Sequence, residues 1–372
     1  MRIGIDARLW SETGVGRYIR NLVFELQEID KKNEYVLFVR KKDYEKVKFQ
    51  ISNFKFQIKI ADIRWHTIEE QIEFPKILNK EKLDLVHFPY FSIPVNYKKP
   101  YVITIHDLIL NHFATGKAST LPAPLYQLKR VGYKYVLSKA IRNAKKIIVP
   151  LNAVKDDLVK TYKIADEKVE VTYEGVDRKV LSSKYKVLSE KNTKYFLYVG
   201  NAYPHKNLKV LIEAFSLFDE KRSEIKLFLV GKDDFFYKRL KKKVSDMGLG
   251  KRIIFYHDVS DDELSGFYKN AIAFVSPSLM EGFGLPVLEA MASSCLVLAS
   301  DIPSFRELAN DGIIYFNSRS VRDTSEKFEL VSDLDKAERE EYIKKGLQRA
   351  SQFSWRKMTE ETRNIYESCI SL

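Results

Sequence analysis

Short apolar runs alternate with longer amphipathic stretches along almost the whole sequence, and no other feature constrains the fold as strongly. A short apolar run suits a buried strand, whereas apolar residues recurring every three or four positions suit a helix. Strands separated by helices predict parallel, doubly wound sheets, so the expected fold class is α/β. The expected strands are Ile3–Asp6, Tyr35–Val39, Phe56–Ile60, Leu85–His87, Val102–His106, Ile147–Pro150, Val169–Thr172, Phe196–Val199, Lys226–Val230, Ile253–Tyr256, Ala273–Pro277 and Leu296–Ser300.

The length of the chain calls for two such sheets. A chain of 372 residues is too long for one ordinary hydrophobic core and suits two domains. The polar stretch 177–194 is the expected linker, between a first domain over 1–176 and a second over 195–354. No strand is expected beyond Asn317, and Ser354 is expected to cap a terminal helix within 355–372.

Composition narrows the class of protein. Hydrophobic residues make up 45% of the chain, which excludes a disordered or fibrous protein. Cys295 and Cys369 lie far apart and form neither a metal-binding nor a disulfide pattern, which predicts a reducing compartment. The start lacks the apolar core of a signal peptide, and no run approaches the ~20 apolar residues of a membrane span. A soluble, cytoplasmic protein is therefore expected.

The net charge of +13 is concentrated in the first half of the chain. Residues 1–180 carry 33 Lys and Arg against 22 Asp and Glu, and no acidic residue lies between Asp107 and Asp156. Such a surplus suits an anionic partner, and we expect a membrane surface, contacted through residues 108–155 at the inner face of the membrane. Nucleic acid is the remote alternative, because no nucleic-acid-binding motif accompanies the charge. A solvated basic face without a partner is the third interpretation.

The strongest candidate for a binding site is the segment Glu281–Glu289, which reads EGFGLPVLE and lies between an expected strand and an expected helix. Gly282 and Gly284 let the backbone approach a ligand, and the N–H groups at a helix start favour a phosphate. Carboxylates on either side of an anion site, Glu281 and Glu289, suit a ligand with a central diphosphate and hydroxyls at both ends. A nucleotide sugar is such a ligand. The alternative is an ordinary turn with two surface glutamates.

This segment, with seven residues between its two glutamates, resembles the signature of glycosyltransferase family four. The resemblance implies the GT-B fold: two Rossmann-like, doubly wound parallel-sheet domains facing a cleft, with a C-terminal helix that crosses back to the first domain. It implies a retaining transferase that needs neither a metal nor another cofactor. By the same resemblance Glu289 holds the ribose hydroxyls and Glu281 contacts the transferred sugar. The amides of Phe283, Gly284 and Leu285 contact the sugar and the diphosphate.

Other segments match the family in the expected order. Lys206 stands where members direct a lysine at the diphosphate, although alone it would be read as one surface lysine among many. Asn201 stands where many members have an arginine, so this chain has one cation fewer to direct at the diphosphate. A small polar residue at that position is common in the mannosyltransferase-like branch. His106 matches a histidine that faces the donor sugar near its anomeric carbon, whereas a lone histidine there would be structural. The expected catalytic residues are therefore His106, Lys206 and Glu281.

The remaining matches are weaker. Gly14 and Gly16 form a short loop after the first strand, which in the family faces the diphosphate and the acceptor. Lys232 and Val259 complete the expected donor-binding set. Ser294 departs from the glycine that is usual there, so the backbone of that turn is expected to differ. The sequence Asp333-Leu334-Asp335 has the spacing of a metal motif but lies in a charged, helix-like tail, and no metal site is expected.

The resemblance predicts a hexosyltransferase but leaves its substrates open. Residues 1–22, 84–113 and 195–215 look most like the mannosyltransferase branch, which favours GDP-mannose as donor and a lipid-linked or other membrane-bound glycan as acceptor. UDP-glucose, UDP-N-acetylglucosamine and dTDP-rhamnose are the alternative donors. Rival activities on the same fold are a sugar-nucleotide epimerase and a glycogen-synthase-like polymerase, and a non-catalytic nucleotide-sugar sensor is a further alternative.

Overall fold

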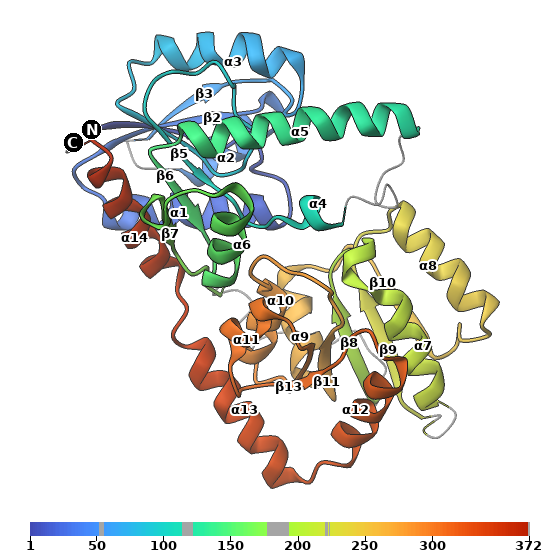
Figure 1. Cartoon of the computed structure of the whole chain (residues 1–372). Coiled ribbons are helices and arrows are strands. Elements are labelled where there is room, and N and C mark those ends of the chain that lie inside the picture. The colour runs from blue at the N-terminus through green and yellow to red at the C-terminus, as the bar shows by residue number, and fades with distance from the viewer. Residues whose placement is uncertain (52–55, 114–121, 177–192, 220–221, 223, 371–372) are drawn as a thin grey trace. The chain divides into compact units, whose positions relative to one another are not determined.

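The computed structural model describes residues 1–51, 56–113, 122–176, 193–219, 222 and 224–370 (Figure 1). The chain divides into two units, the first made of residues 1–108, 119–174 and 354–372 and the second of residues 109–118 and 175–353. Of the expected linker, residues 177–192 lie outside the described part. No helix in the described part of the chain is long and apolar enough to span a bilayer.

The first unit is built on a seven-stranded parallel sheet in the order β3-β2-β1-β4-β5-β6-β7. Two strands that are distant in sequence, β2 and β4, flank β1, so the order reverses there as in doubly wound sheets. The strands are β1 (Arg2–Asp6), β2 (Glu34–Val39), β3 (Phe56–Ile60), β4 (Leu85–Phe88), β5 (Tyr101–Thr104), β6 (Lys146–Val149) and β7 (Val169–Val171). The helices are α1 (Gly14–Ile29), α2 (Tyr44–Gln50), α3 (Ile68–Lys80), α5 (Ala123–Asn143), α6 (Asn152–Tyr162) and α14 (Trp355–Ser368).

Helix α14 belongs to the first unit although the chain enters it from the second. Ser354 caps it as predicted, because the Ser354 hydroxyl accepts a hydrogen bond from the Lys357 N–H at 3.2 Å. Helix α14 packs against α1, and its Tyr366 hydroxyl lies 2.6 Å from Nδ1 of the buried His87 on β4. The predicted return of the C-terminal helix to the first domain is confirmed.

The second unit contains a six-stranded parallel sheet in the order β10-β9-β8-β11-β12-β13, which reverses at β8. Its last strand, β13, was not expected from the sequence, although it lies in the apolar run from Ile313 to Phe316. The strands are β8 (Tyr195–Val199), β9 (Lys226–Val230), β10 (Ile253–Tyr256), β11 (Ala273–Ser276), β12 (Val297–Ser300) and β13 (Ile314–Phe316). The helices are α4 (Ile109–His112), α7 (Leu208–Asp219), α8 (Phe235–Asp246), α9 (Asp261–Asn270), α10 (Leu285–Ala292), α11 (Pro303–Ala309), α12 (Val321–Asp333) and α13 (Lys336–Ala350).

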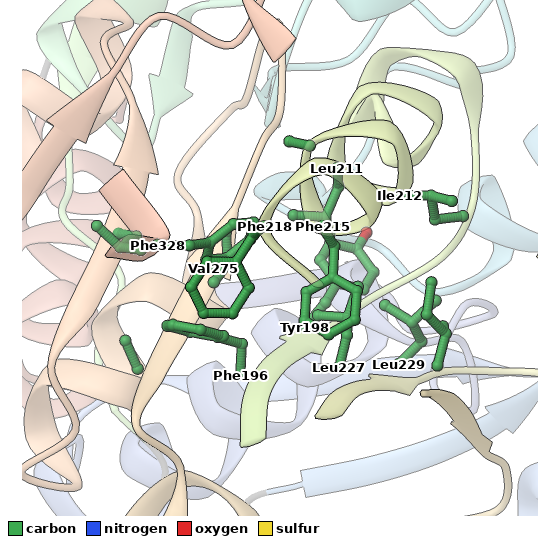
Figure 2. Packing of buried hydrophobic residues seen from close by; sticks show 14 of the residues in the cluster. Phe196, Tyr198, Leu211, Ile212, Phe215, Phe218, Leu227, Leu229, Val275 and Phe328 are labelled. Atoms are coloured by element: carbon green, nitrogen blue, oxygen red, sulfur yellow. The ribbon is translucent and has the colours of Figure 1, made fainter. Parts of the chain in front are cut away.

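Aromatic side chains fill the core on one face of the second sheet (Figure 2). Phe328 of α12 lies against Phe196 of β8, with ring centroids 4.5 Å apart, and against Phe218 of α7 at 5.6 Å. All three side chains are fully buried. Phe328 thus joins α12, which lies beyond the expected strands, to the middle of the sheet. The two parallel sheets with their helices confirm the predicted α/β class.

Phe328→Ala is expected to lower the free energy of unfolding of the second unit by about 3–5 kcal/mol, because it leaves a cavity between α12, α7 and β8. Urea denaturation followed by far-UV circular dichroism measures the change. Leu330→Ala removes an exposed side chain from the same helix and should change stability by about 0.5 kcal/mol or less. Equal losses from the two variants would contradict this packing role.

Candidate active site

The loop between β11 and α10 carries the candidate signature, and its geometry depends on one glycine. Gly284 caps α10 with φ at 94°, a left-handed conformation that favours glycine. A Cβ atom at this position would lie 2.7 Å from Cε1 of Phe305, so packing also requires glycine. The predicted helix start, with Pro286 in its first turn, is confirmed.

Three consecutive N–H groups are available at this helix start. Within the described residues, the amides of Phe283, Gly284 and Leu285 donate to no backbone or side-chain acceptor. The first N–H groups of a helix have no partner in the helix itself, and the helix dipole places partial positive charge there. This stretch of backbone can therefore receive an anionic oxygen without giving up an existing hydrogen bond.

Lys206 and Glu281 meet beside these amides as an ion pair. The Lys206 ammonium donates to Glu281 Oε1 at 2.6 Å, and the Ser278 hydroxyl donates to the same oxygen at 2.6 Å. The Lys206 and Glu281 side chains are 17% and 11% exposed, so the pair is largely withdrawn from solvent. Burial by itself would raise the pKa of Glu281, but the charge and hydrogen bond of Lys206 outweigh it and hold the pKa below its ordinary value.

Backbone contacts hold the two loops that carry this pair. The Leu279 N–H donates to the His205 carbonyl at 2.8 Å, which joins the loop after β8 to the loop after β11. The Ser304 hydroxyl donates to the Glu281 carbonyl at 2.6 Å, which ties the second loop to α11. The carboxylate of Glu281 is thus positioned from both its side chain and its backbone.

Glu289 lies in the second turn of α10 and is almost fully buried. Its Oε2 accepts a hydrogen bond from the Tyr268 hydroxyl of α9 at 3.0 Å. Glu289 and Glu281 therefore have different partners: the Tyr268 hydroxyl binds Glu289, whereas the Lys206 ammonium and the Ser278 hydroxyl bind Glu281. Tyr268 was not identified from the sequence, because nothing local marks it as a partner of a residue 21 positions away.

The loops after β8 and β9 approach each other at two glycines. A Cβ atom on Gly231 would lie 2.2 Å from the carbonyl oxygen of Gly200, so any larger residue would separate the loops. The Tyr237 hydroxyl donates to that same carbonyl at 2.8 Å. Next in the chain, the Asn201 side chain accepts from the Tyr203 N–H at 3.2 Å, so it supports the turn that leads to Lys206.

The predicted donor-binding residues of the second unit all follow the carboxyl ends of neighbouring strands. Asn201 and Lys206 follow β8, the exposed Lys232 follows β9, the half-buried Val259 follows β10, and the loop from Glu281 follows β11. These four strands are adjacent in the order β10-β9-β8-β11. Ligands of doubly wound sheets bind at this edge, beside the strand where the order reverses. The structure therefore brings this predicted set to one edge of one sheet.

In the first unit the two predicted loop glycines differ. Gly16 is packed under the preceding loop, because a Cβ atom there would lie 2.7 Å from the Trp10 carbonyl oxygen and 2.8 Å from that of Leu9. Gly14 begins α1, and a Cβ atom there would meet nothing within 4 Å. Packing thus explains the glycine at 16, whereas neither packing nor a left-handed backbone requires one at 14.

His106 follows β5, and both of its ring nitrogens lie close to oxygen acceptors. Its Nε2 lies 3.0 Å from the Pro89 carbonyl, which only accepts, and its Nδ1 lies 3.2 Å from Glu174 Oε1. Burial would lower the pKa of His106, but the hydrogen bond and negative charge of Glu174 outweigh burial and raise it above its ordinary value. Tyr18 of α1 packs edge-on against the ring at 4.9 Å. Nothing in the local sequence indicates that His106 pairs with Glu174, which lies 68 positions away.

Two other sequence features have structural explanations. Ser294 adopts φ of 58°, so a serine here takes the left-handed conformation that glycine favours. Asp333 pairs with Arg222 at 2.5 Å, and Asp335 caps α13 by accepting from the Glu338 N–H at 2.9 Å. Both carboxylates of the metal-like motif therefore have structural partners.

Two family profiles match consecutive parts of the chain. The profile described as Glycosyltransferase Family 4 matches residues 13–180, and the profile described as Glycosyl transferases group 1 matches residues 182–349. The chain is a family-four glycosyltransferase. The first profile spans the loop glycines and His106, and the second spans every predicted donor-binding residue from Asn201 to Glu289.

Relatives of this glycosyltransferase include proteins named as mannosyltransferases. It is 28% identical over 315 residues to the O-antigen chain mannosyltransferase RfbU of Salmonella typhimurium. That alignment covers 82% of this chain and 84% of the relative. It is 28% identical over 300 residues to the O-antigen chain mannosyltransferase B of Escherichia coli, covering 76% and 74%. Among solved structures, HepE from Anabaena in complex with UDP and glucose matches with a TM-score of 0.77 at 15% identity, over 99% of this chain and 100% of that one. The predicted GT-B fold is thereby confirmed.

The stability of this glycosyltransferase should depend on pH through His106. Because the folded pKa is raised, the His106–Glu174 pair stabilises fully below the unfolded pKa of about 6.5, and this contribution is lost as pH rises through the folded pKa. NMR of the imidazole should show His106 still protonated where an ordinary histidine has titrated. Glu174→Gln should lower the His106 pKa and flatten this part of the stability profile. An unchanged His106 titration in that variant would show that Glu174 does not hold the proton.

Proposed function

We propose that this enzyme transfers a mannosyl residue from GDP-mannose to a glycan acceptor, with retention of configuration and without a metal ion. The observation that carries the transfer chemistry is the Lys206–Glu281 pair beside the unpartnered amides of Phe283, Gly284 and Leu285. A cation and three N–H groups can stabilise the charge that develops on a leaving diphosphate. In other enzymes a divalent metal ion often supplies that charge.

Lys206 has to change partners during the proposed reaction. In the structure its ammonium is neutralised by Glu281. A diphosphate would draw the ammonium away, and the Glu281 carboxylate, still held by Ser278, would then be free to accept hydrogen bonds from hydroxyls of the transferred sugar. The ion pair thus keeps both groups in place before the donor binds, so little reorganisation is needed at the moment of reaction.

The stereochemical proposal follows from the groups present. Substitution at the anomeric carbon would pass through an oxocarbenium-like transition state as the nucleoside diphosphate leaves. Once Lys206 has moved to the diphosphate, the Glu281 carboxylate would accept hydrogen bonds from Ser278 and from the sugar hydroxyls, which would make it a poor covalent nucleophile. We therefore favour attack of the acceptor on the same face as the leaving phosphate. His106 belongs to this proposal through the family resemblance, as a contact of the transferred sugar.

The choice of mannose rests on the relatives. Two proteins named O-antigen chain mannosyltransferases each share 28% identity with this chain over most of its length. This supports GDP-mannose as donor and a growing, lipid-linked polysaccharide as acceptor, used at the inner face of the cytoplasmic membrane. A UDP-sugar is the second candidate, because the HepE structure contains UDP and glucose.

Lys206→Ala and Glu281→Ala should each lower kcat by at least about a hundredfold, the loss typical of one removed transition-state contact. Each single variant also leaves one charge without its counter-charge, which destabilises the fold. The double variant removes both charges, so it should be more stable than either single variant yet no more active. Lys209→Ala, at an exposed position on α7, is the matched control and should keep full turnover. Near-normal turnover in either single variant would refute the role of that residue.

A thermal-shift panel of GDP, UDP, dTDP and ADP, with and without EDTA, tests the donor and the metal. A nucleotide at one hundred times its dissociation constant should stabilise the protein by about 2.7 kcal/mol. We expect GDP to stabilise it equally with and without EDTA. Stabilisation by UDP or dTDP instead would overturn the mannosyl proposal, and loss of the shift in EDTA would overturn the metal-free one. If no nucleotide stabilises the protein, the donor site from Lys206 to Glu289 is wrongly assigned.

A further inference from the structure

Helix α5 of the first unit is apolar on two opposite faces. Its inner face carries the fully buried Leu137, Ala140 and Ile141. Its outer face carries four large apolar side chains, which are unusual together on a surface that faces water. They are spaced by three, three and four residues. These are Leu125, Leu128, Val131 and Tyr135, which are 55%, 71%, 66% and 55% exposed.

The four outer residues form a continuous stripe. At about 100° per residue they fall within an arc of about 120°, centred opposite the buried face. A helix that is apolar on both faces is ordinarily buried on both. The first half of α5 extends past the strands of its own sheet in Figure 1, and no described segment of the first unit covers the stripe.

Exposed cations flank this stripe, in a stretch of the sequence that contains no acidic residue. On the helical wheel Lys129 and Lys134 flank it on its two sides, and Lys139 and Arg142 continue its line in the last turns. Lys129, Lys134, Lys139 and Arg142 are all exposed. No Asp or Glu occurs from residue 108 to residue 155, so no local carboxylate neutralises them. The outer face of α5 therefore combines apolar side chains with strong positive charge.

We propose that α5 docks the first unit on a lipid surface that bears anionic headgroups. The stripe Leu125, Leu128, Val131 and Tyr135 would enter the boundary between headgroups and acyl chains, as apolar faces of interfacial helices do. The flanking lysines would contact the headgroups, each contributing about fivefold in affinity. A second copy of this chain fits the surface less well, because a symmetric contact would place the same cations against one another. The proposal deepens the proposed function, since a bilayer would hold a lipid-linked acceptor.

Vesicle flotation with the full chain tests the docking. Vesicles of phosphatidylcholine mixed with phosphatidylglycerol should carry the protein, whereas vesicles of phosphatidylcholine alone should carry much less. Leu128→Ser combined with Val131→Ser should weaken binding to the mixed vesicles at least about tenfold, because it removes the centre of the stripe. Lys129→Gln combined with Lys134→Gln should weaken binding about twenty-fivefold and reduce its sensitivity to salt.

Phe49→Ser is the matched control for the apolar variant. Phe49 is 91% exposed and lies on α2, whose crossover from β2 to β3 runs across the sheet in the opposite direction to that of α5. Right-handed crossovers in opposite directions place their helices on opposite faces, so Phe49 lies away from the stripe. This variant should bind mixed vesicles like the unmodified protein. If it weakens binding as much as the α5 variant, the apolar contact is not specific to α5.

Two further outcomes would overturn the proposal. Equal, weak binding to both kinds of vesicle would remove the lipid surface as the partner. A concentration-dependent dimer in analytical ultracentrifugation that disappears in the Leu128→Ser, Val131→Ser variant would make a second copy the partner. The nucleotide thermal shift of each variant separates this test from that of the proposed function. Vesicle binding with no nucleotide response would leave the docking standing and refute the donor site, and the reverse result would do the opposite.

Discussion

The ion pair between Lys206 and Glu281 is the contact on which the candidate site of the second unit depends. It spans the loops that leave β8 and β11, which are neighbours in the sheet but far apart in the sequence. Removing one partner of a withdrawn ion pair leaves the other charge uncompensated, which is far more harmful than removing both. The loop geometry and the charge state of the site are therefore set by the same contact. The close approach of Gly200 and Gly231 extends this arrangement to the loop after β9.

The first unit uses the same device at the carboxyl ends of its strands. After β1, the buried Arg8 donates to both oxygens of Asp6, at 2.8 and 2.7 Å, and to Glu70 at 2.7 Å. Glu70 of α3 also accepts from the Ser92 hydroxyl at 2.7 Å, so the loop after β1, helix α3 and the loop after β4 converge on one carboxylate and one guanidinium. After β5, His106 pairs with Glu174. In both units charged side chains hold irregular backbone in place where the regular hydrogen bonds of the sheet end.

The sequence was sufficient to predict the elements whose signals are local. Apolar runs located twelve strands, Ser354 marked a helix start, and Gly284 with its following proline marked another. What it could not predict depends on pairings across long separations. Nothing in the local sequence joins Glu289 to Tyr268 or His106 to Glu174, because the sheet order creates those contacts. The basic stretch was recognised as a surplus of charge, but its apolar stripe became visible only when the structure showed which face of α5 is buried.

The position of helix α14 in the chain affects the order in which the two units can fold during synthesis. Trp355 packs edge-on against Tyr18, and the Tyr366 hydroxyl meets the buried, neutral His87, whose pKa burial lowers to about 3. The first unit is therefore completed by a helix that leaves the ribosome only after the second unit has been synthesised. Its sheet must wait through the synthesis of the entire second unit with the face of α1 uncovered and with Nδ1 of the buried His87 lacking its hydrogen-bond partner. The second unit, continuous from residue 175 to 353 apart from a short upstream segment, is the part that can fold first during translation.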